Sequence, residues 1–529
     1  MKHRMFIPDF LKRAVTYYPD KTAVVDGEIR LTYRQLGERV NRLSNMLIDL
    51  GIKKGDRVAY LAPNTLQKLE GMFGVTQVGA ATVPLNIRLI PSAYAYIINH
   101  SGAKILMADA ELAPLVEPVR KELGCVDHFI LLPSPDCEER EGWISYEKLL
   151  EKYSAETPPI PEMDEMDLAS ILYTSGTTGL PKGAMHSHRS LYFNAINGLI
   201  HVRVTDRDVL LHILPLFHVN GWGTPFMITS MGGTHVMLRK IDPAHIFELI
   251  EREKVSLACM APTVVNMLLH EPKAKTARIS HHLRAIVAGA APPPSYIEKV
   301  EDLLNWEFIQ GYGATETAPL VLLTQFKSHM DPSIENVRRI KAKAGMCLMN
   351  VDVRVVDDAG RDVSHDGKQI GELIVRGNNV MEGYWRQQEE TDRVIKDGWY
   401  YSGDMATIDE EGYVDIVDRK KDIIISGGEN ISSIEIEGVM ARHPAVLEAA
   451  VIAVPDDKWG EVPHAVCIPK EGRNVSEEEL IAFCRNHLPS FKSPKSCSFV
   501  KSFPRTATGK VRKMELREPF WADKKKKVN

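Results

Sequence analysis

Short apolar runs alternate with helical periodicity along much of the chain, and this alternation restricts the fold more than any other feature. The run RVAYLA at 57–62 is followed by a helical stretch from about Thr65 and then by the run ATVPLN at 81–86. The same texture returns at 209–238 and at 255–290. Strands separated by helices are typical of βαβ units and a largely parallel sheet. We therefore expect an α/β fold of layered sheets for the large N-terminal part of the chain.

The texture changes further along the sequence. Between 345 and 417, short β-like pieces such as VDVRVVD and GELIVRG alternate with Asp, Gly and Asn turns, which indicates a small β-barrel or meander. After DRKKD at 418–422 the pattern is mixed again, with helices expected at 433–442 and 476–487. A chain of 529 residues exceeds what one hydrophobic core supports, so we expect two or more compact units.

Composition and charge exclude several classes of protein. The net charge of −5 argues against a general nucleic-acid binder, because such proteins carry a basic footprint. The seven scattered cysteines form no CxxC pair, so we expect reduced thiols and neither a disulfide nor a zinc framework. No apolar run has the length of a signal-peptide core or a membrane span, and we expect a cytoplasmic protein.

The segment YTSGTTGLPKG at 173–183 is rich in glycine and hydroxyl groups beside a single cation. Its glycines let the backbone turn tightly and point several N–H groups at phosphate oxygens. Pro181 and Gly183 flank Lys182, so the segment is not a Walker A motif, and a surface turn is the alternative interpretation. The candidate phosphate-binding residues are Thr174, Ser175, Gly176, Thr177, Thr178, Gly179 and Lys182.

A second segment, QGYGATET at 310–317, carries groups suited to a nucleotide. The ring of Tyr312 could stack on a purine between Gly311 and Gly313. Thr315 and Glu316 place a hydroxyl beside a carboxylate, and oxygens of this kind suit Mg²⁺, which bridges nucleotide phosphates. In isolation, such a segment is more often a turn with a capping threonine and a solvated glutamate.

Seven segments together resemble the adenylate-forming superfamily of acyl-CoA synthetases, luciferases and peptide-synthetase adenylation domains. They follow the order of that superfamily and cover nearly the whole chain. They are YTSGTTGLPKG (173–183), LPLFHVNGWG (214–223), GAAPPP (289–294), GYGATET (311–317), GWYYSGD (398–404), DRKKDIIISGGENIS (418–432) and PRTATGK (504–510).

The resemblance implies a two-step ligase that uses ATP, Mg²⁺ and coenzyme A. A carboxylate attacks the α-phosphate of ATP to give an acyl-adenylate and pyrophosphate, and a thiol then displaces AMP. It also implies an N-terminal AMP-binding domain over 1–417, a hinge at 418–421 and a mobile α+β C-terminal domain over 422–529. Lys421 matches the hinge residue about which that small domain swings.

The resemblance assigns roles to individual residues of this sequence. Lys510 would bridge the attacking carboxylate and the α-phosphate, Thr315 would contact the α-phosphate, and Thr174 and Glu316 would hold Mg²⁺. Asp404 would accept the ribose hydroxyls, and Arg419 would also reach the nucleotide. The expected adenine slot comprises Gly289, Ala290, Ala291, Gln310, Gly311 and Tyr312, and Gly313 is a further cofactor-binding residue. The segment for the pantetheine arm comprises Gly427, Gly428, Glu429 and Asn430.

The segment HVNGW at 218–222 bears on the choice of acid. It resembles fatty-acyl-CoA synthetases, in some of which the matching tryptophan gates the acyl channel, so we expect a medium- or long-chain fatty acid. His218 would face the carboxylate, and Trp222 would be the gate, with plain core packing as the alternative. Related enzymes with a similar motif act on short-chain, thioether or aryl acids, which keeps those substrates open.

Three positions depart from the pattern of many relatives, and three other functions compete. Asp418 stands where many relatives have glycine, and Ile425 and Asn430 stand where some long-chain enzymes have lysine and tryptophan.

A module that loads a carrier protein is disfavoured because no carrier follows Lys510 in this sequence. A luciferase would need a luciferin, and a noncatalytic nucleotide sensor would be expected to lack Lys510 or Glu316.

The remaining expectations concern partners. We expect small molecules only, namely an acid, ATP and CoA, with no nucleic acid. The lysine run at 524–527 is better explained as a solvated tail than as a weak contact with anionic lipid. Whether the chain forms a homodimer stays open.

Overall fold

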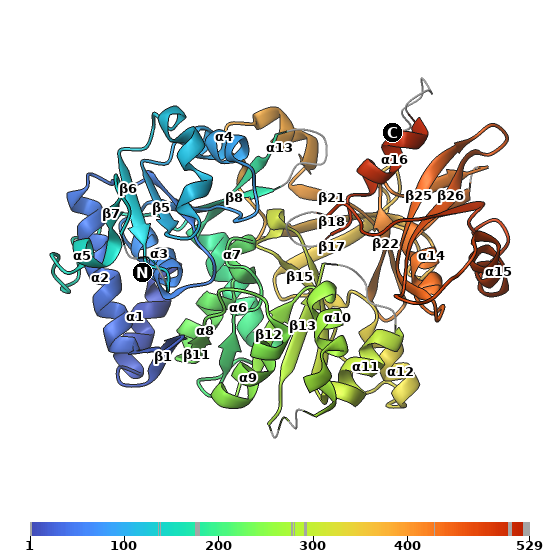
Figure 1. Cartoon of the computed structure of the whole chain (residues 1–529), viewed down its shortest axis with the longest axis horizontal. Coiled ribbons are helices and arrows are strands. Elements are labelled where there is room, and N and C mark those ends of the chain that lie inside the picture. Colours follow the sequence, from blue (N-terminus) through green and yellow to red (C-terminus); the bar gives the residue numbers. More distant parts are fainter. Residues whose placement is uncertain are drawn as a thin grey trace.

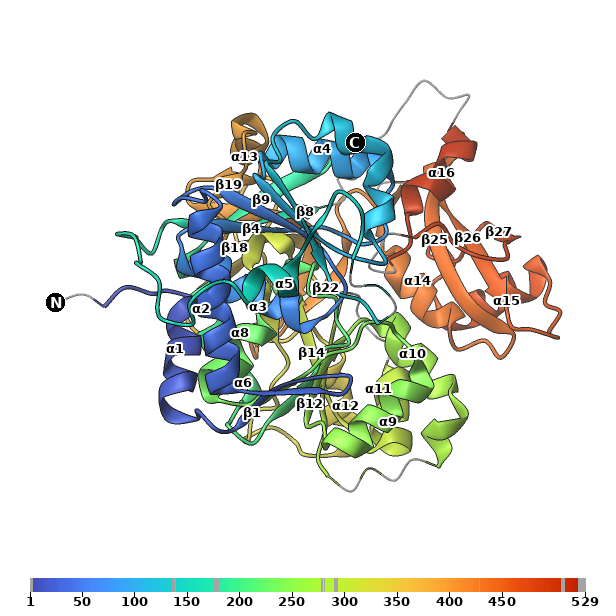
Figure 2. The ribbon, with the colours of Figure 1, turned by 60° about the vertical axis from the view of Figure 1, so that its left-hand side comes forward.

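The computed structural model describes residues 3–135, 137, 139–174, 180–276, 279, 281–289, 294–427, 429–505 and 510–521. Figure 1 shows a broad body built from the N-terminal and central parts of the chain, with the C-terminal elements gathered at one side. Figure 2 shows the same C-terminal group standing apart from the layered body. The α/β character expected from the sequence is confirmed.

The first large sheet has eight strands and is mostly parallel. Its strands are β3 (Arg57–Leu61), β4 (Ala81–Pro84), β5 (Ile105–Asp109), β6 (His128–Leu132), β7 (Ile144–Ser145), β8 (Leu168–Thr174), β9 (Lys182–Ser187) and β19 (Gly383–Tyr384). The order is β19-β9-β8-β4-β3-β5-β6-β7, and only the pairs β8·β9 and β9·β19 are antiparallel. The glycine- and threonine-rich segment joins β8 to β9, so both of its ends, Thr174 and Lys182, are anchored in this sheet.

The second large sheet has nine strands in the order β16-β15-β14-β13-β12-β10-β11-β1-β2. Its central strands from β1 to β14 run parallel, as the alternating sequence pattern predicts. The strands are β1 (Thr22–Asp26), β2 (Ile29–Thr32), β10 (Val209–Leu211), β11 (Thr234–Val236), β12 (Leu257–Met260), β13 (Arg284–Ala288), β14 (Glu307–Gly313), β15 (Leu320–Leu323) and β16 (Met346–Cys347).

Helices cover these sheets, and α2 illustrates why they form where they do. The hydroxyl of Thr32 accepts from the backbone N–H of Gln35, whose side chain accepts from the N–H of Thr32, which is a capping box. The helices are α1 (Pro8–Tyr17), α2 (Tyr33–Asp49), α3 (Leu66–Gln77), α4 (Pro91–Ser101), α5 (Tyr146–Leu150), α6 (His188–Val202), α7 (Val219–Trp222), α8 (Thr224–Met231), α9 (Pro243–Glu253), α10 (Pro262–His270), α11 (Pro294–Leu304), α12 (Ile334–Lys341) and α13 (Gln388–Val394).

Two smaller sheets follow in the chain. The region for which a barrel or meander is expected is a five-stranded antiparallel sheet of β17 (Val351–Val356), β18 (Gly371–Gly377), β20 (Ile395–Lys396), β21 (Trp399–Ile408) and β22 (Val414–Arg419). The last sheet comprises β23 (Ile424–Ser426), β24 (Glu429–Ile431), β25 (Val446–Asp456), β26 (Gly460–Pro469) and β27 (Ser496–Phe499). Its helices are α14 (Ser433–Met440), α15 (Glu477–His487) and α16 (Lys513–Trp521).

Two absences expected from the sequence concern the described part of the chain. All seven cysteines are free thiols in the structure. Among the described helices, none combines the length and the apolar character that crossing a bilayer requires.

Candidate active site

The carboxyl ends of β8 and β14 bring the two nucleotide-like segments of the sequence into the same region. Thr174 ends β8 and pairs in register with Lys182, the first residue of β9. Gly313 ends β14, and a short 3-10 turn, Thr315–Thr317, follows it. Open α/β sheets bind their ligands outside the carboxyl ends of the strands. The strand directions therefore place these hydroxyl and carboxylate groups where an α/β protein holds a ligand.

Tyr312, Asp404 and Arg419 form one hydrogen-bonded group, although they are far apart in the sequence. The Tyr312 phenol donates to Asp404 Oδ2 at 2.5 Å, and Arg419 Nε lies 2.8 Å from Asp404 Oδ1. Asp404 and Arg419 are direct partners in the pairing of β21 with β22. Burial, followed by the Asp404 charge, raises the pKa of Tyr312, so its hydroxyl stays protonated and donates. The Asp404 side chain is only 6% exposed, which makes it a well-oriented acceptor.

Glu316 and Thr315 are held in place by neighbours from other elements. The Tyr384 hydroxyl donates to Glu316 Oε1 at 2.7 Å. His186 on β9 hydrogen-bonds through Nε2 to the Thr315 carbonyl at 2.8 Å. Burial lowers the pKa of His186 to about 4, so the ring is neutral near pH 7 and donates this N–H. The described residues contain no cluster of three or more His, Cys, Asp or Glu side chains suited to a metal. A metal here would depend on Glu316 and on oxygens of a bound nucleotide.

Lys510 reaches this region from the C-terminal part of the chain. A Cβ built on Gly289, just past the end of β13, would lie 3.6 Å from Lys510 Cε. The pKa of Lys510 is lowered, first by loss of hydration among the surrounding protein atoms and next by the guanidinium of Arg419, while Asp404 and Glu316 act in the opposite direction. The predicted catalytic lysine is thus among the predicted nucleotide-binding residues.

His218 lies close enough to Lys510 for the ammonium to act on its titration. Burial lowers the pKa of His218 to about 4, and the positive charge of Lys510 contributes in the same direction. The imidazole is therefore neutral near pH 7 and offers one donor and one acceptor.

The residues after His218 adopt an uncommon backbone. Val219, Asn220 and Trp222 have φ values of 48°, 50° and 59°, and Gly221 and Gly223 have 62° and 74°. Left-handed geometry costs a residue with a Cβ on the order of 1–2 kcal/mol, and such strain persists only where the surroundings impose it. The turn is held by Asn194, whose amide donates to the Trp222 carbonyl at 3.2 Å. Trp222 itself is 6% exposed and packs in a hydrophobic cluster with Val219.

The Lys182 side chain is paired with another residue of the same chain. It forms an ion pair with Glu390 of α13, and its ammonium lies 5.2 Å from the centre of the Tyr384 ring. The same tyrosine donates to Glu316, so one aromatic side chain joins Lys182 and Glu316. To bind phosphate, the Lys182 ammonium must either break its ion pair with Glu390 or contact both groups at once.

The residues expected at the hinge and in the GGEN segment lie in the sequence where the five-stranded antiparallel sheet ends, after β22, and the last sheet begins, at β23 and β24. Lys421 lies two residues after the end of β22, and its carbonyl accepts from Arg517 of α16 at 2.9 Å. Gly427 has a φ of 60°, and a Cβ there would lie 2.6 Å from the Trp459 ring. Glu429 and Asn430 begin β24. Eight residues expected at the site lie outside the described residues, namely Ser175, Gly176, Thr177, Thr178, Gly179, Ala290, Ala291 and Gly428.

Sequence reasoning missed the supporting residues of this site. No sequence motif includes the three supporting residues. Their role follows only from their contacts: Tyr384 with Glu316, Glu390 with Lys182, and His186 with Thr315. The separations in sequence are 68, 208 and 129 residues, so no local pattern could have signalled them.

Family models match the two parts of the chain that meet at this site. The model described as AMP-binding enzyme matches residues 11–385, and the model described as AMP-binding enzyme C-terminal domain matches residues 435–510. The chain belongs to the AMP-binding enzyme family. The second match ends at Lys510, the C-terminal residue that lies beside Gly289.

Two relatives of the chain are described as CoA ligases for different acids. A long-chain-fatty-acid–CoA ligase of Thermus thermophilus is 38% identical over 98% of this chain and 96% of its own length. A 4-hydroxybutyrate–CoA ligase of Metallosphaera sedula is 37% identical over 96% of this chain and 93% of its own. The chain is thus assigned to the AMP-forming acid–thiol ligases, the acyl-CoA synthetases of the adenylate-forming superfamily.

Solved structures of the superfamily share the whole fold. The ATP-bound MatB of Rhodopseudomonas palustris is 30% identical, with a TM-score of 0.88 over 99% of this chain and all of its own. An anthranilate CoA ligase bound to anthranoyl-AMP is 25% identical, with a TM-score of 0.89 over 98% of both chains.

Proposed function

We propose that this chain joins a carboxylic acid to coenzyme A in two half-reactions at the site around Lys510. In the first, an acid oxygen bonds to the α-phosphorus of ATP, and the bond to the β-phosphate oxygen breaks, which releases pyrophosphate. In the second, the thiolate sulfur of CoA bonds to the acyl carbon, and AMP leaves with the electrons of the broken C–O bond. The observation that carries this proposal is the proximity of Lys510 to Gly289, Asp404 and Glu316.

Lys510 supports the first half-reaction by electrostatics. Two anions must approach each other, and a cation between them offsets their repulsion by roughly 4 kcal/mol per unit pair at 4 Å and an effective dielectric of 20. Neutral His218 is suited to orient the acid carboxylate by a hydrogen bond without adding a second charge beside Lys510. Thr315, whose backbone is fixed by His186, contacts the α-phosphate in this proposal.

The nucleotide is held by the residues on β13, β14, β21 and β22. Asp404 accepts from the ribose hydroxyls, and Arg419 holds that carboxylate in place. The base is flanked by Gly289, Gln310, Gly311, Tyr312 and Gly313. The threonine-rich segment binds the phosphates. Thr174 and Glu316 would hold Mg²⁺, which neutralises phosphate charge when bound; a single carboxylate with substrate phosphates and waters is the usual arrangement for this ion.

Rotation about Lys421 separates the half-reactions in this proposal. It would withdraw Lys510 and bring Gly427, Glu429 and Asn430 toward the acyl-adenylate. Arg517 donates a hydrogen bond to the Lys421 carbonyl. Such a rotation would either break this bond or move both residues together. We infer domains over 1–417 and 422–529 on this basis.

The acid in this proposal is a medium- or long-chain fatty acid, with a short-chain, thioether or aryl acid as the alternative. A medium- or long-chain fatty acid, expected from HVNGW, requires a channel past Trp222 and hence movement of that side chain. A short-chain acid requires no such movement, and the burial of Trp222 favours it as the second candidate.

The reducing conditions of the cytoplasm suit the seven free thiols, and we propose that location. A similar enzyme, the trans-cinnamate:CoA ligase of Petunia hybrida, is described as peroxisomal. A tagged copy of the full chain, followed by fractionation of its source cells, would separate these locations.

A direct assay tests the reaction. The purified chain is incubated with ATP, Mg²⁺, CoA and linear, branched or aromatic acids, and products are identified by mass. We expect AMP, pyrophosphate and one or more acyl-CoA thioesters, with ¹⁸O from a labelled acid appearing in AMP. Release of ADP, or AMP without the label, would contradict the proposed adenylation.

A further inference from the structure

Lys68 is a buried lysine that the proposed reaction does not use. It stands on α3, 3% exposed, and its amine donates to the Ala62 carbonyl at 2.9 Å. Its nitrogen also lies 5.4 Å from the centre of the Phe217 ring. Among the described residues no carboxylate pairs with it, and burial lowers its pKa to about 7. A protonated lysine has three donors, so one carbonyl leaves most of its hydrogen-bonding capacity unused.

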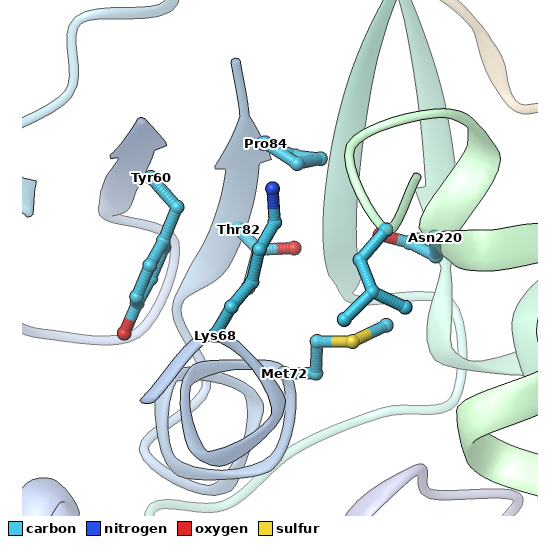
Figure 3. A pocket seen from close by; sticks show the side chains of 7 residues that line it. Tyr60, Lys68, Met72, Thr82, Pro84 and Asn220 are labelled. Carbon is cyan, nitrogen blue, oxygen red and sulfur yellow. The ribbon is translucent and has the colours of Figure 1, made fainter. Parts of the chain in front are cut away.

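A small cavity surrounds this amine. It is lined by Lys68, Tyr60, Met72, Thr82, Pro84, Leu216 and Asn220. Figure 3 shows the Lys68 side chain rising from its helix, with its nitrogen near Pro84 and with Tyr60 and Asn220 on opposite sides. The cavity has a volume of about 10 Å³, which is room for one water molecule or one group of that size.

Two side chains that line this cavity have a buried polar atom without a hydrogen-bond partner among the described residues: the Asn220 amide nitrogen, which donates, and the Tyr60 hydroxyl, which can donate or accept. Asn220 is 2% exposed, and its amide nitrogen has no hydrogen-bond partner among the described residues. Thr82 is already engaged, since its hydroxyl contacts Ser170 Oγ at 3.1 Å. Buried donors are costly when unpaired. Lys68 and Asn220 together therefore favour an oxygen acceptor in the cavity over an alkyl group.

The cavity borders the segment that carries His218. Leu216 and Asn220 line it from two residues before and two residues after that histidine. Asn64, in the loop that precedes α3, accepts from the Leu216 N–H at 2.7 Å and donates to the Leu214 carbonyl at 3.0 Å. These bonds fix the spacing between the Lys68 helix and the left-handed turn. An acid whose carboxylate lies at His218 would extend along that turn.

We propose that the cavity is an oxygen-binding subsite at the distal end of the acid pocket, where Lys68 and Asn220 hold a hydroxyl, carbonyl or carboxylate oxygen of the substrate. This inference rests on the proposed function and specifies its short-chain candidate. The strained turn places Asn220 in the cavity wall, and the buried amine supplies a strong donor opposite it. Lys68 is then a specificity-determining residue, and acids ending in a methyl group are poorer substrates than their oxygen-bearing equivalents.

Matched pairs of acids test the subsite in the full chain. 4-Hydroxybutyrate is compared with pentanoate, 5-hydroxypentanoate with hexanoate, and 6-hydroxyhexanoate with heptanoate, because each pair differs only by OH in place of CH₃. We expect one length at which the hydroxy acid exceeds its partner in kcat/KM by about 10-fold or more, as a hydrogen bond to a charged donor allows. Dicarboxylates of the same lengths show whether an anionic oxygen is preferred to a neutral one.

Two variants assign the preference to the cavity. Lys68→Met should bring the ratio of the pair to about 1 by lowering the rate with the hydroxy acid alone. Asn220→Gly should reduce the ratio while keeping a backbone that tolerates positive φ. Lys53→Met, the same change at an exposed lysine outside the cavity, should leave the ratio unchanged. Thermal unfolding of each variant shows that it is folded.

Three outcomes separate the hypotheses. A ratio near 1 at every length in the unaltered chain overturns the subsite, as does a preference that survives both Lys68→Met and Asn220→Gly, which would leave the cavity with water only. If no acid yields AMP, the proposed function fails instead. Calorimetric titration of each acid into the full chain then measures its binding affinity without the reaction. Equal affinities for the two acids of every pair overturn the subsite.

Discussion

Tyr384 donates a hydrogen bond to Glu316, with 2.7 Å between the phenol oxygen and Oε1. The tyrosine lies on β19 at the edge of the eight-stranded sheet, whereas the glutamate lies in the turn after β14 of the nine-stranded sheet. This bond therefore spans the two large sheets. It aims the predicted metal-binding carboxylate, because one of its oxygens is fixed and the other is left for a ligand.

Removing this bond tests the role of Glu316. Tyr384→Phe should raise the KM for magnesium–ATP by roughly 10-fold, as the loss of a hydrogen bond to a charged group allows, with a smaller effect on kcat. Initial rates at varied Mg²⁺ and ATP measure it. The matched control is Tyr17→Phe at a 69% exposed tyrosine, which should not change either constant. An unchanged KM in Tyr384→Phe would show that Glu316 needs no orientation from this residue.

Lys510→Ala should separate the two half-reactions. Adenylation of the acid by ATP should fall by about 10²–10³, since preorganised charge at a developing negative centre contributes on that scale. Thioester formation from a preformed acyl-adenylate should change only a few-fold, because Lys510 has left the site by then in the proposed rotation. Rapid-quench measurement of pyrophosphate and of acyl-CoA follows the two steps separately.

The control for that variant is Lys501→Ala, an exposed lysine in the same C-terminal segment. Neither half-reaction should respond to it. Equal losses in both half-reactions of Lys510→Ala would mean that the lysine serves the whole cycle or the fold, and rotation about Lys421 would then lose its support.

The sequence predicted the elements well where local patterns decide them. The alternation of β3, α3 and β4 follows directly from short apolar runs and helical periodicity. Asp404 and Arg419 are a different case. The resemblance placed both at the nucleotide, but their pairing across two strands was not predicted, because it depends on strand register, which composition does not encode.

Other features depend on tertiary contacts and were not predictable. Lys182 was expected to face phosphate, and the structure pairs it with Glu390 from a distant helix. Lys68 stands on α3, whose residues are buried on every side, so the helix shows no polar face that would reveal an unusual lysine. The left-handed turn at Trp222 is likewise imposed by packing, since two of its three non-glycine residues favour other conformations.

Trp222 can be tested as the element that limits chain length. Trp222→Gly removes the ring and suits the positive φ of 59°, so the backbone should keep its course. If the ring closes the channel, the best substrate should become longer, with up to about 4-fold in kcat/KM for each added methylene that is buried at about 0.8 kcal/mol. A series of linear acids from butyrate to palmitate measures the profile.

Trp222→Phe is the matched control, because it keeps an aromatic group in the channel. Its profile should stay close to that of the unaltered chain. A profile that is unchanged in Trp222→Gly, in a variant that remains folded, would identify Trp222 as a packing residue of the core cluster and would remove the gate from the proposed function.

Lys68→Met should stabilise the fold in a pH-dependent manner. Burial lowers the pKa of Lys68 from 10.5 when exposed to about 7 in the folded chain, so folding is opposed by the cost of burying its charge. That cost is fully present below about pH 7 and disappears as pH rises toward 10.5, because the folded state loses the proton first. The gain in free energy of unfolding should therefore be largest near pH 6, on the order of 3–5 kcal/mol, and should shrink by pH 9.

Chemical denaturation at pH 6, 7, 8 and 9 in the absence of substrates measures this difference. Lys53→Met, at an exposed lysine ahead of β3, serves as the control and should leave stability nearly unchanged at each pH. A constant gain for Lys68→Met across the range would mean that its amine is charged to the same extent in both states. The buried amine would then be fully compensated without a ligand, and the case for an oxygen-binding subsite would weaken with it.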